Sequence, residues 1–146
     1  MISPDKTTTI LSTTLLVAAL LLSLLAFRLF PQDKTRRVLF FPNGVTGELG
    51  GEEHLVPVAR HREEALRLFV EELVLGPNTL GAVRVLPPRT EIEFLMLRER
   101  RLFVDFSPEI LDVQDALSIS FDDVLEMTEY NIRYNFPFLR QITVTV

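Results

Sequence analysis

The sequence predicts an α+β fold. We expect a two-layer domain with a small mixed β-sheet and two helices on one face, in the order β-α-β-β-α-β, preceded by one transmembrane helix. An uncharged, strongly apolar run occupies 7–27, and a helix needs roughly 20 such residues to cross a bilayer. After this run, strand-like segments rich in β-branched and aromatic residues alternate with two amphipathic helical patterns, which pack most simply as helices on a sheet. The domain itself, 37–146, follows a polar linker at 31–36 and has room for one modest core.

The N-terminal part is predicted to be a membrane anchor. Residues 1–6 form a short tail, and 7–30 form an uncleaved transmembrane helix of the signal-anchor type. The apolar core is longer than that of a secretory signal. It is followed by Phe27, Arg28 and Leu29, whereas a signal peptidase requires small side chains. A cleaved signal peptide is the alternative.

The charges do not decide which way the domain faces. Lys6 alone precedes the apolar run, and four basic residues follow it: Arg28, Lys34, Arg36 and Arg37. Positive residues tend to stay cytoplasmic, which favours a domain inside the cell. Long acidic domains cross membranes regardless of flanking charges, however, and this chain has a net charge of −5. The orientation stays open on these grounds.

Five strands are predicted from period-two or continuous apolar patterns bounded by turn residues. They are 37–41, 55–58, 91–97, 102–106 and 140–146. The glycine-rich stretch 44–53 is predicted to be a loop. The second strand is placed at a sheet edge, because Pro57 has no N–H group to donate to a neighbouring strand.

Two helices are predicted from apolar residues at helical spacing. The first covers 61–75 and ends at Gly76, where a left-handed residue followed by proline stops a helix. The second covers 121–135. It begins with a capping box, in which Ser120 is followed three residues later by Asp123 instead of the usual glutamate.

No catalytic, cofactor-binding or metal-ligating residue is predicted, and we expect neither a cofactor nor an enzymatic activity. His54 and His61 lie seven residues apart, which matches no strong metal motif even with Glu52 or Glu53 as a third ligand. Both are expected to be solvated surface histidines. Asp105 beside Ser107 suggests a carboxylate and a nucleophile, but a serine before a proline is more typical of a helix start.

Surface charge limits the classes of partner. The net acidic charge argues against a nucleic-acid partner, and the absence of cysteine excludes disulfides and thiolate metal sites. Acidic residues gather on the second helix of the domain, and we expect a solvated face or a docking patch for a basic partner there: Asp122, Asp123, Glu126 and Glu129. A basic tip, expected to be a solubilising turn, is predicted at 98–101.

Four short segments follow one another through the domain: 38–42, 72–77, 86–87 and 104–107. This ordered set resembles the GerMN domain of bacterial sporulation and germination proteins over nearly all of 37–146. The resemblance implies a bacterial, membrane-attached, non-catalytic domain outside the cytoplasm that mediates assembly or envelope contacts. Family members are often lipoproteins and many carry two such domains, whereas this chain has no cysteine and room for one domain.

We therefore expect a single-pass membrane protein whose domain is an interaction or assembly module of the cell envelope. Its partner would be another envelope protein or a second copy, bound through a sheet edge such as the final strand. The alternative is a module that binds cell-wall glycan or peptide through 98–101 or through Tyr130 and Tyr134. A hydrolase centred on Asp105 is a third hypothesis.

Overall fold

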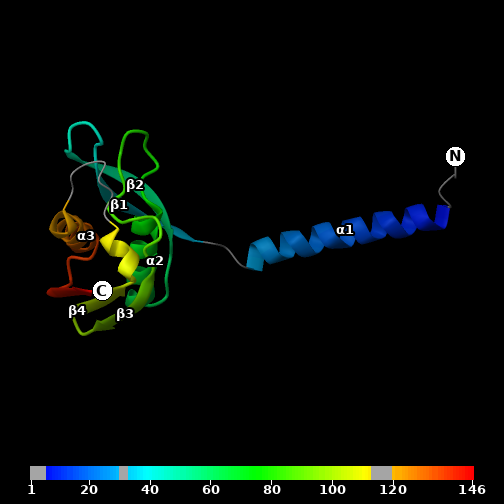
Figure 1. The fold of residues 1–146 in the computed structure, drawn as a ribbon. Helices are drawn as coiled ribbons and strands as arrows, with labels where there is room; N and C mark the ends of the chain where they lie inside the picture. Colours follow the sequence, from blue (N-terminus) through cyan, green and yellow to red (C-terminus); the bar gives the residue numbers. More distant parts are fainter. Residues whose placement is uncertain (1–5, 30–32, 113–119) are drawn as a thin grey trace. The chain divides into compact units, whose positions relative to one another are not determined.

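The computed structural model describes residues 6–29, 33–112 and 120–146. The chain divides into two compact units at the boundary between Asp33 and Lys34. The first unit contains helix α1 (Lys6–Leu29), and the second contains all the other helices and strands (Figure 1).

The predicted N-terminal helix forms as α1. Its early turns carry hydroxyl side chains, and Thr13 Oγ1 donates a hydrogen bond to the carbonyl oxygen of Thr9 at 2.8 Å. Among the residues that the structure describes, no helix is both long enough and apolar enough to span a membrane. A helix is thus present over Lys6–Leu29, residue 30 lies outside the described residues, and the predicted membrane span is not shown.

The second unit has an α+β architecture, as the sequence predicts. Its elements are β1 (Lys34–Pro42), β2 (Leu49–Pro57), α2 (Arg62–Leu75), β3 (Ile92–Arg98), β4 (Arg101–Phe106), the short 3₁₀ helix η1 (Pro108–Leu111), α3 (Phe121–Asn135) and β5 (Gln141–Thr145). Helix α3 has the predicted bounds, and the β3–β4 hairpin matches its prediction closely. Strand β1 begins at Lys34, so the last residues of the predicted linker at 31–36 belong to a strand.

The strands form two sheets, and the prediction of a single mixed sheet was wrong. Strands β1 and β2 form an antiparallel ribbon in register from the pair Lys34–Pro57 to the pair Pro42–Leu49. The second sheet has the order β3-β4-β5, with β3 antiparallel and β5 parallel to β4. Helix α3 lies on the crossover connection that a parallel pair requires.

The outer edge of β1 is covered by helix α3. Asn135 of α3 donates from Nδ2 to the carbonyl oxygen of Val38 at 2.7 Å, and its Oδ1 accepts from the N–H of Val38 at 3.3 Å. Asn131 bonds the backbone of Phe40 in the same way. These side chains use the backbone groups through which another strand would pair with β1.

Strand β2 occupies the second half of the stretch 44–53 that the sequence predicts as a loop. Gly51 lies opposite Phe40 in the ribbon, and a Cβ atom on Gly51 would lie 3.0 Å from the Phe40 ring. The aromatic ring therefore takes the space that a side chain on β2 would fill. Glycine disfavours strands on propensity alone, so this cross-strand fit is invisible in the local sequence.

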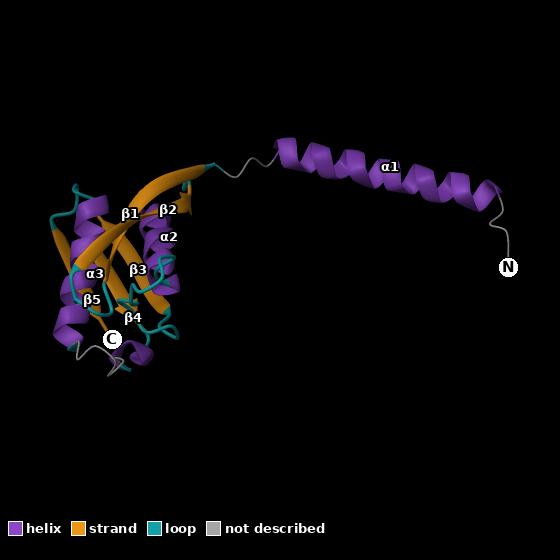
Figure 2. Ribbon diagram, turned by 90° about the horizontal axis from the view of Figure 1, so that it is seen from above, coloured by secondary structure: helices purple, strands orange, loops and turns teal. Residues whose placement is uncertain are grey.

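The core lies between the strands and the apolar faces of α2 and α3. Helix α2 contacts β2 and β3, and α3 contacts β1; Figure 2 shows both helices beside the strands. The largest fully buried side chains come from all parts of the unit: Phe41, Phe69, Phe106, Leu39, Leu66, Leu73, Leu86, Leu102, Ile110 and Ile132. Burial of each such side chain contributes about 1.5–3 kcal/mol to folding.

Both predicted helix signals are confirmed. Helix α2 ends at Gly76, whose φ of 85° lies in the left-handed region. At the start of α3, the Ser120 hydroxyl accepts from the N–H of Asp123 at 3.2 Å, and Asp123 Oδ2 accepts from the N–H of Ser120 at 2.8 Å. This is the reciprocal capping box.

Candidate functional site

The most concentrated polar chemistry of the domain surrounds His54 on β2. The side chain of His54 points into the core and is 1% exposed. Strand alternation places it there, because His54 and Val56 are the two buried residues of β2. The prediction of a solvated histidine at 54 was therefore wrong, whereas His61, which precedes α2, is exposed.

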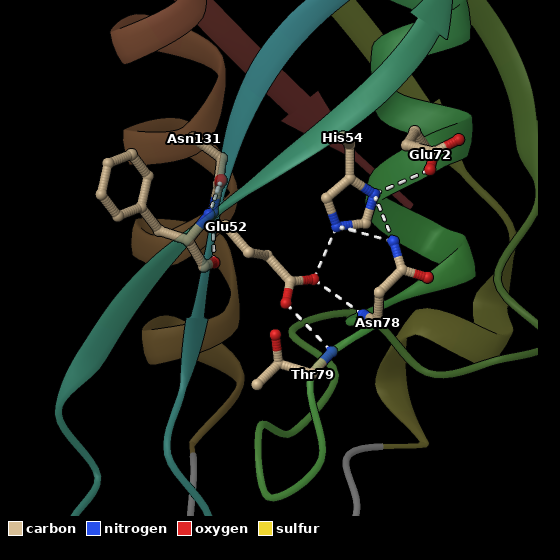
Figure 3. Close-up of polar contacts among 7 residues, drawn as sticks. Glu52, His54, Glu72, Asn78, Thr79 and Asn131 are labelled. Atoms are coloured by element: carbon tan, nitrogen blue, oxygen red, sulfur yellow. Dashed lines mark hydrogen bonds and ion pairs between the residues drawn. The ribbon is translucent and has the colours of Figure 1, made fainter.

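Two glutamates hold the His54 ring from opposite sides (Figure 3). Nδ1 lies 2.7 Å from Glu72 Oε1 on α2, and Nε2 lies 2.6 Å from Glu52 Oε1 on β2. With a carboxylate at each nitrogen, the ring is best satisfied when both nitrogens carry protons and donate. Burial lowers the pKa of His54, but the hydrogen bonds to Glu72 and Glu52 outweigh it and raise that pKa above its ordinary value.

Glu52 also fastens the loop that follows α2. Its Oε1 accepts the backbone N–H of Asn78 at 2.8 Å, and its Oε2 accepts the backbone N–H of Thr79 at 3.1 Å. Partial burial raises the pKa of Glu52, while the hydrogen bonds from Thr79, His54 and Asn78 lower it by more, so the net shift is downward. The cluster therefore joins β2, α2 and this loop through one charged centre.

This cluster is built as a structural clamp. A charged imidazole has no lone pair for a metal, and the two carboxylates bind opposite nitrogens instead of converging on one point. Within the described ranges, no group of three potential ligands is arranged to hold a metal ion. Because the ring is 1% exposed, it is also out of reach of a substrate.

Asp105 and Ser107, the residues of the hydrolase hypothesis, each form a hydrogen bond within the domain. Asp105 Oδ1 accepts from the hydroxyl of Thr145 on β5 at 2.6 Å. The Ser107 hydroxyl accepts the N–H of Glu91 at 3.0 Å. Asp105 is thus engaged with β5 and Ser107 with the residue that precedes β3, and no hydrogen bond joins the two side chains among the described residues.

The remaining candidate contacts lie at two surfaces. Tyr130 and Tyr134 on α3 are 45% and 55% exposed, with their ring centroids 6.4 Å apart. At the basic tip, Arg100 Nε donates to the carbonyl oxygen of Phe138 at 2.6 Å, and Arg101 lies 3.8 Å from Glu99. The side chains of the tip are therefore partly used within the domain, whereas the tyrosine rings face outward.

Comparison with known proteins gives a match at the level of the fold. No protein-family model matches the sequence, and no curated protein matches it. The first GerMN domain of the sporulation protein GerM from Bacillus subtilis is similar with a TM-score of 0.56 and 16% identity, over 76% of this chain and 81% of that one. The fold of the domain is similar to that of a GerMN domain.

The tandem GerMN domains of GerM are similar as well, with a TM-score of 0.52 and 16% identity. That match covers 77% of this chain and 39% of the tandem chain, so this chain corresponds to part of the longer protein. At these identities the likeness concerns the fold alone. It agrees with the resemblance of the four sequence segments to GerMN domains.

Proposed function

We propose that this chain is a non-catalytic interaction or assembly module of the bacterial cell envelope. Its fold, which is similar to that of a GerMN domain of a sporulation protein, supports the proposal, because the resemblance to GerMN domains implies a non-catalytic assembly role. The His54 cluster agrees with it, since the strongest set of titratable groups is buried and internally satisfied. In this proposal the domain lies outside the cytoplasm and α1 associates with the membrane.

The observation that carries the proposal is the outer edge of β5. Strand β5 ends the second sheet, and among the described strands it pairs with β4 alone. Of the other three edges, two carry side-chain bonds: α3 covers β1, and Glu63 of α2 accepts the N–H of Leu97 on β3 at 2.7 Å. An exposed edge of this kind accepts an added strand from a partner.

Proline substitution at two neighbouring positions of β5 tests this docking mode. Successive N–H groups of a strand point to opposite edges, so of Thr143→Pro and Val144→Pro one removes a donor facing β4 and the other removes a donor facing outward. Circular dichroism and thermal melting identify the variant that keeps the fold. We expect that variant to lose the adducts that a photo-crosslinker at Gln141 forms with envelope proteins in cells.

The matched control is Thr143→Val, which keeps both the N–H group and the branched side chain. It should give the same adducts as the unchanged chain. Adducts that persist when the outward-facing donor is removed, in a variant that melts normally, would contradict docking at β5.

The membrane association is tested separately. The exposed side chains of α1 are apolar over most of its length, which supports association with lipid: Leu11, Leu15, Leu16, Val17, Leu20, Leu21, Leu22, Leu24 and Leu25. We expect the full chain to sediment with membranes, and a reporter fused after Val146 to be active only if it functions outside the cytoplasm. Activity of a cytoplasm-dependent reporter alone would reverse the proposed orientation.

The alternative function, binding of cell-wall glycan or peptide, is favoured by the outward-facing rings of Tyr130 and Tyr134. Binding to isolated wall material separates it from the first proposal. A wall-binding domain would sediment with purified wall sacculi that have been stripped of protein, whereas a protein-binding module would stay in solution.

A further inference from the structure

A groove beside α3 combines features that the β5 edge lacks. It has a volume of about 290 Å³ and lies between the end of the β1–β2 ribbon and the first half of α3. Its lining residues are Gly47, Leu49, Asp123, Glu126, Met127 and Tyr130. The groove therefore has an apolar part, an aromatic side and two carboxylates.

The aromatic side is held in place by packing. Tyr130 and Tyr134 lie one helical turn apart on α3, and both contact the ring of Phe40 edge-on, with centroid distances of 5.1 and 4.8 Å. Phe40 is itself fixed, because Asn131 bonds both its N–H and its carbonyl oxygen. The tyrosine rings are thus held by packing while about half of each residue stays exposed, which lowers the entropy lost when they bind a ligand.

The carboxylates of the groove are not neutralised within the domain. Asp123 bonds to Ser120, and these hydrogen bonds lower the pKa of its carboxyl group. Glu126 is exposed and has no cationic partner among the described residues, whereas Glu129 on the same helix is paired with Arg133 at 2.6 Å. Two negative charges therefore lie beside the partly exposed ring of Tyr130.

We propose that this groove binds a lysine- or arginine-bearing peptide segment of a partner protein, with the cation between Glu126 and the face of Tyr130. Cations are attracted both by carboxylates and by tyrosine rings, so the two parts of the groove act together on such a side chain. A neutral sugar would stack on the rings but would gain no charge pairing from the carboxylates. This site is separate from the β5 edge and adds a side-chain preference to the proposed interaction function.

The composition of the chain supplies a specific probe. Tyr130 and Tyr134 are its two tyrosines and it contains no tryptophan, so the fluorescence comes from Tyr130, which lines the groove, and from Tyr134 one helical turn away. We would titrate the purified full chain in a non-ionic detergent with the peptide acetyl-Ala-Lys-Ala-Lys-Ala-amide. We expect saturable quenching that weakens as salt is added, because the exposed charges are screened. The same peptide with both lysines acetylated should leave the fluorescence unchanged.

Two variants locate the effect. Glu126→Gln keeps the shape of the side chain and should weaken binding about two- to fivefold, the range of an exposed ion pair. Glu71→Gln removes an exposed carboxylate from α2, outside the groove, and should bind like the unchanged chain. Equal quenching by the acetylated peptide, or equal losses in the two variants, would overturn the proposal. Quenching by chitotetraose but not by the lysine peptide would assign the groove to glycan instead.

Discussion

Asn131 of α3 bonds the backbone of Phe40 on β1 as a neighbouring strand would. Its Nδ2 donates to the carbonyl oxygen of Phe40 at 3.0 Å, and its Oδ1 accepts from the N–H at 2.7 Å (Figure 3). Asn135 repeats the pattern two residues away on the strand, at Val38. The spacings agree, because four helical residues rise about 6 Å and two strand residues rise about 6.6–6.8 Å. One helix face thereby satisfies the edge of a strand.

Removal of this amide should destabilise the domain strongly. Asn131 is fully buried, so Asn131→Ala leaves the part-buried N–H and carbonyl oxygen of Phe40 without these partners. We expect a loss of about 2–4 kcal/mol in the free energy of unfolding, measured with urea. The control is Glu129→Ala on the same helix, which removes an exposed ion pair and should cost less than about 1 kcal/mol. Similar losses in both variants would show that the amide bridge contributes little.

The stability of the domain should fall as the pH rises from weakly acidic to weakly alkaline values. His54 is buried and faces the carboxylates of Glu52 and Glu72, which raise its pKa in the folded state. The unfolded chain has the ordinary value of about 6.5. The stabilisation by the charged ring is therefore fully present below that value and is lost as the pH rises through the folded pKa.

Melting temperatures across this range test the assignment. His54→Gln should be less stable than the unchanged chain at low pH and should show a flatter pH profile. His61→Gln, at an exposed position, should keep the original profile. If the profile keeps its slope in His54→Gln, another group is responsible for it.

The loss of folding stability at acid pH should depend on Glu52. Because the pKa of Glu52 is lowered in the folded state, its contribution is present above the unfolded value of about 4.3 and is lost as the pH falls through the folded pKa. Glu52→Gln should therefore lose less stability than the unchanged chain when the pH falls through this range. Glu53→Gln is the control, since Glu53 is exposed and forms only a loose pair with Arg36 at 3.4 Å. If Glu52→Gln loses as much stability at acid pH as the unchanged chain, Glu52 does not act as a charged partner of His54.

The end of α2 should resist substitution. Gly76 has a φ of 85°, and a Cβ atom there would lie 2.6 Å from Arg84 Cγ. We expect Gly76→Ala to cost about 1–3 kcal/mol, as such a backbone conformation is strained for any side chain. Gly81→Ala measures the effect of backbone strain without a clash. At Gly81 φ is 88°, and no atom lies within 4 Å of the added methyl group. Gly76→Ala should be the more damaging of the two; the reverse order in urea unfolding would exclude the clash with Arg84.

Several elements were predictable because their signals are local. The capping box at Ser120, the glycine at Gly76 and the period-two patterns of β3 and β4 lie within a few residues of the structure they specify. The same locality misled the assignment of 44–53, where Gly50 and Gly51 read as a loop but form part of β2. The burial of His54 was missed for the same reason, because it follows from the register of β2.

The sequence by itself determined the α+β class, the N-terminal helix, the bounds of α3 and the resemblance to GerMN domains, since periodicity, caps and breakers act over short stretches of chain. The tertiary structure alone decided that there are two sheets, that His54 lies between two carboxylates, and that the tyrosines stand beside an acidic groove. Each of these depends on contacts between residues far apart in the sequence, such as Asn131 with Phe40 and His54 with Glu72. Such pairs form only when the elements pack, because hydrogen-bond partners are chosen by distance in space and not by position along the chain.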